Sequence, residues 1–350
     1  MIHTSILLAL LTLCTVCYGQ HLADQTPVVE GNKRPPIGRA VPALGKNIGS
    51  MLQDSRNNYW FASNGEGVFY YDGMRLVQIT DRDGLCGNFV RLVKEDVHGK
   101  IWFTTSDGVC CYDGQSIIDY TARINTAPPG IFRPSPGDLF FGRPDGMCVY
   151  NGKSFTSFAI HPVTYFPSPN DINRPYSVYS TLVDREGSVW FGTQERGVCR
   201  FDGARYTYFT AHGLDKAAVR TLFQDRSGNI WAGNNGAGLF RYTGVEFVNV
   251  TDEHGLANPG FLKKLGAKEG TLARPWTMAE DETGTLLIGS IDAGLWKYDG
   301  RVFTNYTTKD GLPGNSIWTI SKDRQGRLWF VVGGEEIGTF NGKTFTRFTF

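Results

Sequence analysis

The sequence predicts an all-β protein built as a single seven-bladed β-propeller of four-stranded antiparallel blades. A short pattern recurs seven times along the 350-residue chain, and segments rich in β-branched and aromatic residues alternate with Gly and Asp turns. No helical period persists between these turns. Hydrophobic residues make up 41% of the chain, which is enough for a large core and excludes wholesale disorder.

The recurring pattern is clearest in residues 225–233, which read DRSGNIWAG, and it returns in residues 184–192, 96–104 and 323–331. Weaker copies lie at residues 54–62, 281–289 and 137–142. The Trp position of the seven copies falls at residues 60, 102, 140, 190, 231, 287 and 329. The spacings are therefore 42, 38, 50, 41, 56 and 42 residues, and such a period is typical of propellers and solenoids.

Each copy reads as four short strands in a meander. An alternating run such as residues 219–225 precedes a D-x-x-G turn, and an apolar aromatic run such as 229–233 follows it. A third run such as 238–244 and an outer period-2 run such as 301–307 complete the unit. Because the pattern starts near Ile48 and ends at Phe350, we expect each blade to use consecutive residues. Closure of the ring then rests on packing between blades.

The turn and the aromatic run each have a structural explanation. Five of the eight Trp residues occupy the same repeat position, which predicts large rings packed between neighbouring blades. The Asp of D-x-x-G is expected to cap the turn backbone, and the Gly to allow a positive φ.

Residues 1–19 read as a signal peptide. The apolar run 6–16 is too short to span a bilayer, and Cys17 and Gly19 supply the small residues expected before a cut between Gly19 and Gln20. A lipoprotein anchor on Cys14 or Cys17 is the alternative interpretation.

Residues 20–46 are rich in Pro and carry no periodic pattern, so we expect a linker or arm, with the propeller in residues 47–350. No later run approaches the roughly 18 apolar residues that a membrane helix needs. The mature chain is therefore expected to be exported to the periplasm or the extracellular space, with no transmembrane segment.

Charge and motifs exclude several functions. The formal net charge of +1 gives no electrostatic footprint for nucleic acid. The six His residues do not cluster with Cys or carboxylates at a metal-binding spacing, and no P-loop, Rossmann fingerprint or G-x-S-x-G elbow is present. We therefore expect no metal, no cofactor and no nucleic-acid partner.

Five Cys residues remain after the signal peptide. Cys110, Cys148 and Cys199 share a repeat position with large apolar residues, so they are expected in the core. Cys111 alternates to the opposite face, and a bridge between Cys86 and Cys111 is conceivable. An odd number of thiols leaves at least one unpaired.

Residues 297–330 read KYDGRVFTNYTTKDGLPGNSIWTISKDRQGRLWF. This text resembles the two-component regulator propeller repeat, in which a D-G-L tag, a Y-D-G turn and an I-W-F strand recur in that order. The resemblance covers nearly everything from Ile48 to Phe350. It implies the fold and recognition habit of the periplasmic sensor half of hybrid histidine kinases, which often respond to polysaccharide breakdown products. No kinase or receiver sequence is present, so phosphotransfer is not implied.

An enzymatic propeller is the alternative. Residues 99–104 resemble the strands of streptogramin lyases, whose chemistry needs a His and a Glu near the channel mouth. The sequence offers no such pair. A non-catalytic module that binds a small molecule, an oligosaccharide, or another exported or membrane protein is therefore favoured over a lyase or hydrolase.

Two enlarged loops, residues 159–177 and 253–275, account for the long spacings and fall on one face by strand count. The loops also hold His161, Tyr165, Phe166, Phe261, Lys263 and Lys264. The fifth residue before each turn Asp varies as Gly49, Arg91, Tyr179, Arg220, Trp276 and Trp318. Aromatic rings stack on sugars and Arg binds carboxylates, so this variation predicts a ligand site at the channel mouth, although an ordinary irregular lining is the alternative. The predicted binding residues are Arg91, Arg174, Tyr176, Tyr179, Arg220, Arg274, Trp276 and Trp318.

Overall fold

The computed structural model describes residues 37–130, 133–135, 137–143, 146–161, 174–261, 268–341 and 344–350. The predicted signal peptide and most of the predicted Pro-rich arm lie outside these residues, as do Tyr165, Phe166, Lys263 and Lys264. Residues 35–350 form one compact unit, and the fold described below is that of this unit.

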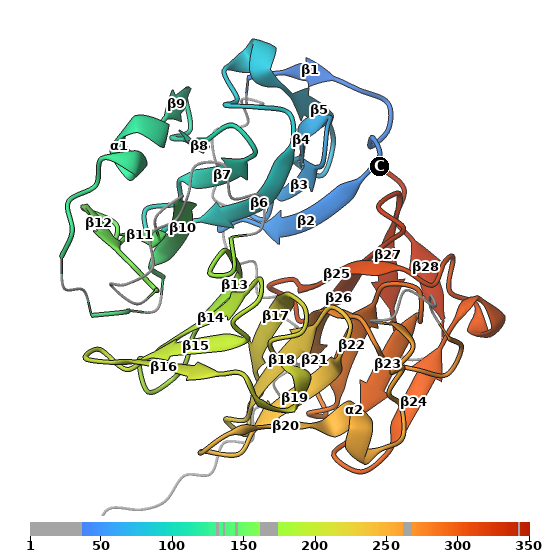
Figure 1. The fold of residues 1–350 in the computed structure, drawn as a ribbon. Coiled ribbons are helices and arrows are strands. Elements are labelled where there is room, and N and C mark those ends of the chain that lie inside the picture. The colour runs from blue at the N-terminus through green and yellow to red at the C-terminus, as the bar shows by residue number, and fades with distance from the viewer. Residues whose placement is uncertain are drawn as a thin grey trace, which may run out of the picture. The chain divides into compact units, whose positions relative to one another are not determined.

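Seven antiparallel sheets form a ring, which confirms the seven-bladed propeller (Figure 1). Each blade uses strands that are consecutive in the chain, and the chain runs from the inner to the outer edge of the blade, apart from one added strand of the first blade described below. The first three blades contain β2 (Ile48–Gln53), β3 (Tyr59–Ser63), β4 (Gly67–Tyr71) and β5 (Leu76–Ile79); β6 (Val90–Glu95), β7 (Ile101–Thr105), β8 (Val109–Tyr112) and β9 (Ile117–Asp119); and β10 (Leu139–Arg143), β11 (Gly146–Tyr150) and β12 (Phe155–Phe158).

The remaining four blades follow the same plan. They contain β13 (Val178–Val183), β14 (Val189–Thr193), β15 (Val198–Phe201) and β16 (Tyr206–Phe209); β17 (Val219–Gln224), β18 (Ile230–Asn234), β19 (Gly238–Tyr242) and β20 (Phe247–Asn249); β21 (Pro275–Glu280), β22 (Leu286–Ser290), β23 (Leu295–Tyr298) and β24 (Phe303–Tyr306); and β25 (Ile317–Lys322), β26 (Leu328–Val332), β27 (Glu336–Phe340) and β28 (Phe345–Arg347). Short helices connect some blades, namely α1 (Thr121–Asn125), α2 (Val250–Glu253) and the 3-10 turns η1 (Asp81–Asp83), η2 (Ala211–Gly213) and η4 (Thr308–Asp310).

Two blades depart from the four-strand plan. The first gains a fifth strand, β1 (Arg39–Ala40), which pairs antiparallel with β5. The third has three strands among the described residues. The segment before β10 contains Pro128, Pro129 and Pro134. Proline has no N–H to donate to a strand ladder, so this stretch is poorly suited to form an inner strand.

The repeated Trp is tied to the repeated Asp by a hydrogen bond that the sequence analysis did not foresee. In five blades the indole Nε1 donates to the carboxylate six residues earlier, as from Trp231 to Asp225 at 2.9 Å. The same Asp225 carboxylate accepts from the backbone N–H of Asn229, so it caps the turn as predicted. In the sixth blade Leu287 replaces the Trp, and Asp281 instead accepts from Thr283 and from the N–H of Thr285.

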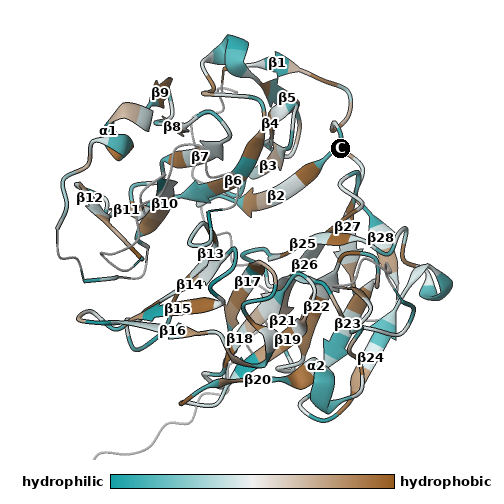
Figure 2. Ribbon diagram, viewed as in Figure 1, coloured by the Kyte–Doolittle hydropathy of each residue, from teal (hydrophilic) through white to brown (hydrophobic). Residues whose placement is uncertain are grey.

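The core consists of seven apolar clusters, one in each seam between neighbouring blades. Figure 2 shows the corresponding concentration of hydrophobic residues on the strands. The cluster that closes the ring joins Ile48 and Phe61 of the first blade to Trp329, Val331 and Ile337 of the seventh. This seam is built like the others, so packing between blades closes the ring, as expected.

In five of the seven blades, facing side chains at one position of the middle strands compensate in size. Phe330 on β26 faces Gly338 on β27, whereas Ala232 on β18 faces Phe240 on β19. The other cross-strand pairs at this position are Phe61–Phe69, Phe103–Cys110, Phe141–Cys148, Phe191–Cys199 and Ile288–Trp296. The three cysteines are fully buried, which confirms their prediction as small core residues.

The five described cysteines are all free thiols. Cys86 approaches Cys110, whose Sγ accepts from the Cys86 backbone N–H at 3.2 Å. The conceivable Cys86–Cys111 bridge is therefore wrong. Cys110 packs in the seam between the first and second blades, and Cys111 on the alternate face packs in the next seam.

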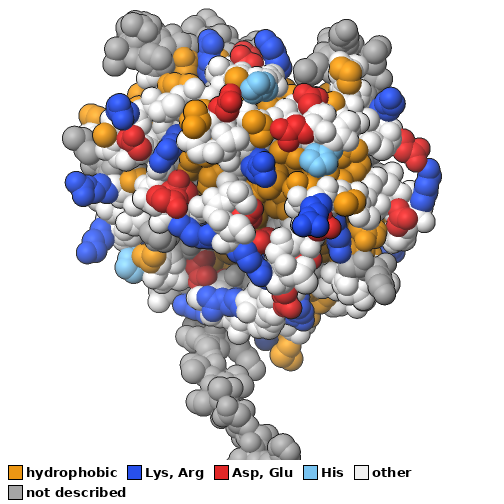
Figure 3. Space-filling model, turned by 90° about the horizontal axis from the view of Figure 1, so that it is seen from below, with side chains coloured by type: hydrophobic (Ala, Val, Ile, Leu, Met, Phe, Trp, Pro, Cys, Tyr) orange, Lys and Arg blue, Asp and Glu red, His pale blue; other side chains and the backbone are white. Residues whose placement is uncertain are grey.

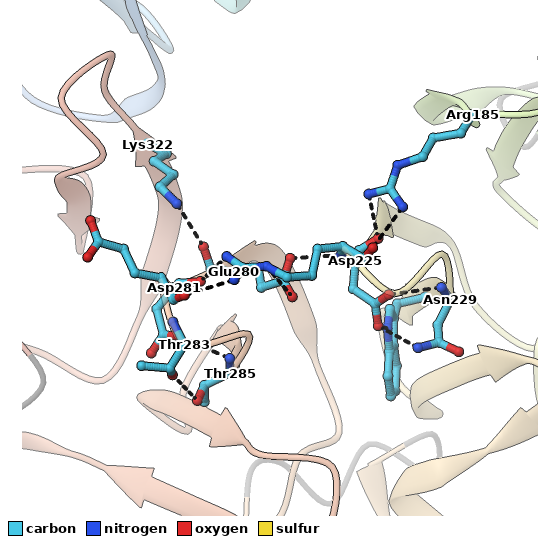
Figure 4. A network of polar contacts seen from close by, with 11 residues as sticks. Arg185, Asp225, Asn229, Glu280, Asp281, Thr283, Thr285 and Lys322 are labelled. Atoms are coloured by element: carbon cyan, nitrogen blue, oxygen red, sulfur yellow. Dashed lines mark hydrogen bonds and ion pairs between the residues drawn. The ribbon is translucent and has the colours of Figure 1, made fainter.

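Arginines on the D-x-x-G turns connect successive blades (Figure 4). The guanidinium of Arg185 donates to the backbone carbonyl of Asp225 at 2.8 Å, and that of Arg226 donates to the carbonyl of Asp281 at 2.8 Å. In the closing seam Arg324 of the seventh blade donates to the carbonyl of Ser55 at 3.1 Å. The ring is thus closed by the same kind of polar contact that joins its interior blades.

Candidate functional site

A β-bulge interrupts each of the six described inner strands near its start. In the fourth blade, for example, the pairing shifts between Val178 and Ser180, so Tyr179 has no partner on β14. The six residues at this position, called the mouth residues below, are Gly49, Arg91, Tyr179, Arg220, Trp276 and Trp318. A bulge re-aims the side chain of its extra residue. The variable repeat position found in the sequence is therefore the bulge position, although the bulge itself was not predicted.

Three consecutive mouth residues form a stack. The guanidinium carbon of Arg220 lies 3.8 Å from the ring centroid of Tyr179, on the preceding blade. It lies 5.0 Å from the ring centroid of Trp276, on the following blade. Both contacts are within the range of cation–π attraction. The two rings therefore hold the Arg220 cation in place.

Arg220 is a half-buried cation whose hydrogen-bonding groups are incompletely paired. Its Nε is buried and has no hydrogen-bond partner among the described residues. Desolvation by burial lowers the pKa of Arg220, and the positive charges of Arg274 and Arg91 lower it further, while Tyr179 acts in the opposite direction. Buried polar groups are nearly always hydrogen-bonded, so an orphaned donor at a channel mouth marks a candidate contact point for a ligand.

Residues just after the second strand of each blade line the same face. Their backbone N–H groups donate to the carbonyl two residues before the mouth residue, as from Gln194 to Ser177 at 2.9 Å and from Ile291 to Arg274 at 3.1 Å. The Oε1 of Gln194 is buried and also lacks a hydrogen-bond partner among the described residues. The described ends of both enlarged loops are therefore anchored beside the mouth, as the strand count predicted.

Arg274 lies next to the mouth but is bound by other groups. Its Nε donates to Oδ1 of Asn235 at 2.9 Å, and its NH1 contacts Oδ2 of Asp292 at 2.7 Å. Phe261 lies under the guanidinium, 5.3 Å from its carbon. A shallow depression with a cavity volume of only about 10 Å³ adjoins this group and is lined by Phe261, Lys268, Thr271, Ala273, Arg274, Ile291 and Ala293.

The structure brings only some of the predicted residues together. Tyr179, Arg220 and Trp276 are in contact. Arg91 and Arg274 are close enough for their positive charges to lower the pKa of Arg220. Trp318 is the mouth residue of the seventh blade, the neighbour of the blade that carries Trp276. Its indole lies against Gly334, where an added Cβ would come within 3.1 Å of the ring.

The two predicted residues at the end of the first enlarged loop are placed differently. Tyr176 packs into the seam between the third and fourth blades, where its ring lies 6.0 Å from that of Tyr208. The carbonyl of Arg174 accepts from the N–H of Ser177 at 2.9 Å. Neither contact involves a mouth residue.

The described histidines belong to other parts of the fold. His98 contacts the carbonyl of Gly152, and His254 contacts the carbonyl of Val250. His161 lies near Tyr176, and His212 faces Glu246. In the part of the chain that the structure describes, no group of three or more His, Cys, Asp or Glu residues could hold a metal ion.

Two segments of the chain, residues 213–236 and 311–333, match the family described as two component regulator propeller. This confirms the resemblance drawn from the repeats. No curated protein matches the chain.

Several solved structures share the fold. The extracellular domain of BT3049 from B. thetaiotaomicron, assigned to a hybrid two component system, is 20% identical with a TM-score of 0.63, over 87% of this chain and 41% of that chain. Virginiamycin B lyase from Staphylococcus aureus is 14% identical with a TM-score of 0.60, over 85% of this chain and 97% of the lyase. PorZ of Porphyromonas gingivalis, a surface component of the type-IX secretion system, is 16% identical with a TM-score of 0.55, over 85% of this chain and 47% of PorZ.

These identities establish a shared fold only. The chain spans about two fifths of the BT3049 extracellular domain (41%), so it corresponds to one portion of that larger protein. Within the described residues, no helix combines the length and apolar character needed to cross a membrane.

Proposed function

We propose that the chain is an exported, non-catalytic recognition module that binds a small molecule or an oligosaccharide at the mouth of its propeller. The observation that carries the proposal is the placement of Arg220 between Tyr179 and Trp276, with a buried Nε that lacks a partner among the described residues. Aromatic rings and Arg are the residues that most often anchor ligands in desolvated sites.

Export is supported by the signal-peptide pattern of residues 1–19 and by the extracellular origin of the similar domains of BT3049 and BT4673. The comparison also favours recognition, since those domains are parts of two component systems. A partner protein on the same face is the other form that recognition could take.

The lyase alternative is less well supported. Its motivation is the shared fold with virginiamycin B lyase, for which a catalytically inactive histidine-to-alanine variant was solved with Quinupristin. None of the six mouth residues is a His or a carboxylate, so these positions supply no acid or base pair. General acid–base chemistry needs such groups within hydrogen-bond reach of the substrate.

A thermal-shift screen of the full chain against oligosaccharides and other small molecules tests the proposal. A compound at about 100 times its Kd should stabilise the fold by roughly 2.7 kcal/mol. The stabilisation should disappear in Trp276→Ala and persist in Arg301→Ala, which changes an exposed residue on an outer turn. Ligands that stabilise the wild type and Trp276→Ala equally would place binding elsewhere and overturn the proposal.

A further inference from the structure

We infer that the mouth recognises a carboxylate carried on a ring, with Arg220 binding the carboxylate and Trp276 stacking on the ring. This inference rests on the proposed function and narrows it to one chemical class of ligand. It is carried by three observations, namely the charge of the mouth, the contacts of Arg220 with two aromatic rings, and the amide of Asn64 beside Gly49.

The mouth residues carry positive charge only. Two of the six are Arg, and none is acidic. In contrast, the surface seen in Figure 3 mixes acidic and basic side chains, in keeping with the net charge of +1. Beside the mouth, the carboxylate of Asp292 is already taken by Arg274. Arg91 is exposed, and its described contact is the ring of Phe89, 5.9 Å from the guanidinium carbon. Arg91 and Arg220 are thus left without an acidic partner among the described residues.

The stack fixes how Arg220 can be approached. The guanidinium carbon lies within cation–π range of the Tyr179 ring on the preceding blade and of the Trp276 ring on the following blade. With a ring of each neighbouring blade against it, the guanidinium offers a ligand chiefly the edge that bears its N–H donors. A carboxylate fits this edge because its two oxygens accept two parallel N–H bonds. The side chain is already held in one orientation, so less conformational entropy is lost when the anion binds.

Gly49 brings a second polar group to the mouth. In a ring of seven blades, the first blade lies across from the fourth and fifth, which carry Tyr179 and Arg220. Gly49 has no side chain, and the position that its Cβ would take lies 3.0 Å from Nδ2 of Asn64. The amide of Asn64 therefore packs against Gly49, where it can bind a polar group of the ligand. Trp276, half-buried beside Arg220, offers its ring as the apolar surface.

Two kinds of compound share this chemistry, acidic sugars and aromatic acids, and matched probes distinguish them. The first pair is trigalacturonate and its methyl ester, and the second is indole-3-acetate and its amide. The members of each pair differ chiefly in the negative charge. Isothermal titration with the full chain should show at least tenfold tighter binding of the acid than of the neutral form in one of the two pairs.

Variants assign the effect to Arg220. Arg220→Gln should weaken binding of the acid at least tenfold and leave the neutral form unchanged, while Arg220→Lys, which keeps the charge but not the planar edge, should restore only part of it. Arg91→Gln should weaken binding of the acid by a smaller factor of about three. Because Arg91 is exposed, this variant should fold normally, so it still tests the role of positive charge if Arg220→Gln fails to fold. Arg301→Gln is the matched control.

The outcomes separate the inference from the proposed function. If acid and neutral forms bind equally and both are lost in Trp276→Ala, the mouth binds ligands but the charge plays no part, and the inference is wrong. The inference also fails if neither acid binds more tightly than its neutral form while the screen finds an uncharged ligand at the mouth. If no compound of any charge binds at the mouth, both the inference and the proposed function fail.

Discussion

The indole of Trp231 donates a hydrogen bond of 2.9 Å to the carboxylate of Asp225, six residues before it in the chain. The same carboxylate accepts a hydrogen bond of 2.7 Å from the side-chain amide of Asn229. One Asp therefore organises the turn on the surface and anchors the largest side chain of the seam behind it. This pairing explains why the two residues recur together in five blades.

Replacing Trp231 by Phe tests this pairing. The ring volume is largely kept, but the hydrogen bond to a mostly buried carboxylate is lost, which should cost about 1–3 kcal/mol of unfolding free energy. Urea denaturation would measure it. Trp276→Ala, at the half-buried mouth, should cost less than Trp231→Ala, for which about 3–5 kcal/mol is expected. Equal losses from the two alanine variants, with ligand binding intact, would mean that Trp276 serves packing and not recognition.

The arginine contact across the closing seam gives a second prediction. Arg324→Ala removes the bond to the Ser55 carbonyl but leaves the apolar seam in place. We expect a loss of about 1 kcal/mol, because charge-assisted bonds are worth more than neutral ones but this one is exposed to solvent. Arg301→Ala should change the denaturation midpoint little. Identical denaturation midpoints for Arg324→Ala and Arg301→Ala would show that the turn arginines do not stabilise the ring.

Asp323 predicts a pH dependence. Burial alone would raise the pKa of its carboxyl, but hydrogen bonds from Trp329 and Arg327 outweigh it and hold the pKa below its usual value. A depressed folded pKa contributes stability above the unfolded value of about 4, and this contribution is lost as the pH falls through the folded pKa. The gap in stability between wild type and Asp323→Asn should therefore be full at pH 7 and shrink below about pH 4. Denaturant midpoints across this range measure it, and a gap that widens in acid would contradict the assignment.

The cysteine arrangement makes a chemical prediction. Mild oxidation with diamide, which accepts the two hydrogens released by a pair of thiols, should join Cys86 to Cys110. Peptide mapping would identify the linked peptides. Cys111→Ser should still form the bridge, whereas Cys110→Ala should not. A Cys86–Cys111 peptide from the native protein would refute the register of β8.

Spacing within the sequence was enough to predict the blades, because the strands and turns of one blade are set by residues close together in the chain. The same spacing located the mouth residues, since a bulge recurs at one position of the repeat. Contacts between blades could not be read in this way. Arg185 binds a carbonyl on the next blade, and Tyr176, predicted for the site, packs in a seam. Such partners depend on how two distant repeats face each other, which no local pattern records.

The compensating sizes of facing side chains bear on the engineering of this protein from its own repeats. Phe330 opposite Gly338 and Ala232 opposite Phe240 fill the same space in opposite ways. A Cβ at Gly338 would already come within 2.6 Å of the Phe345 ring. Averaging the seven repeats into one idealised unit would mix the two solutions and produce either collisions or voids. Shuffled or duplicated blades should thus be exchanged as whole units, with both facing strands kept together.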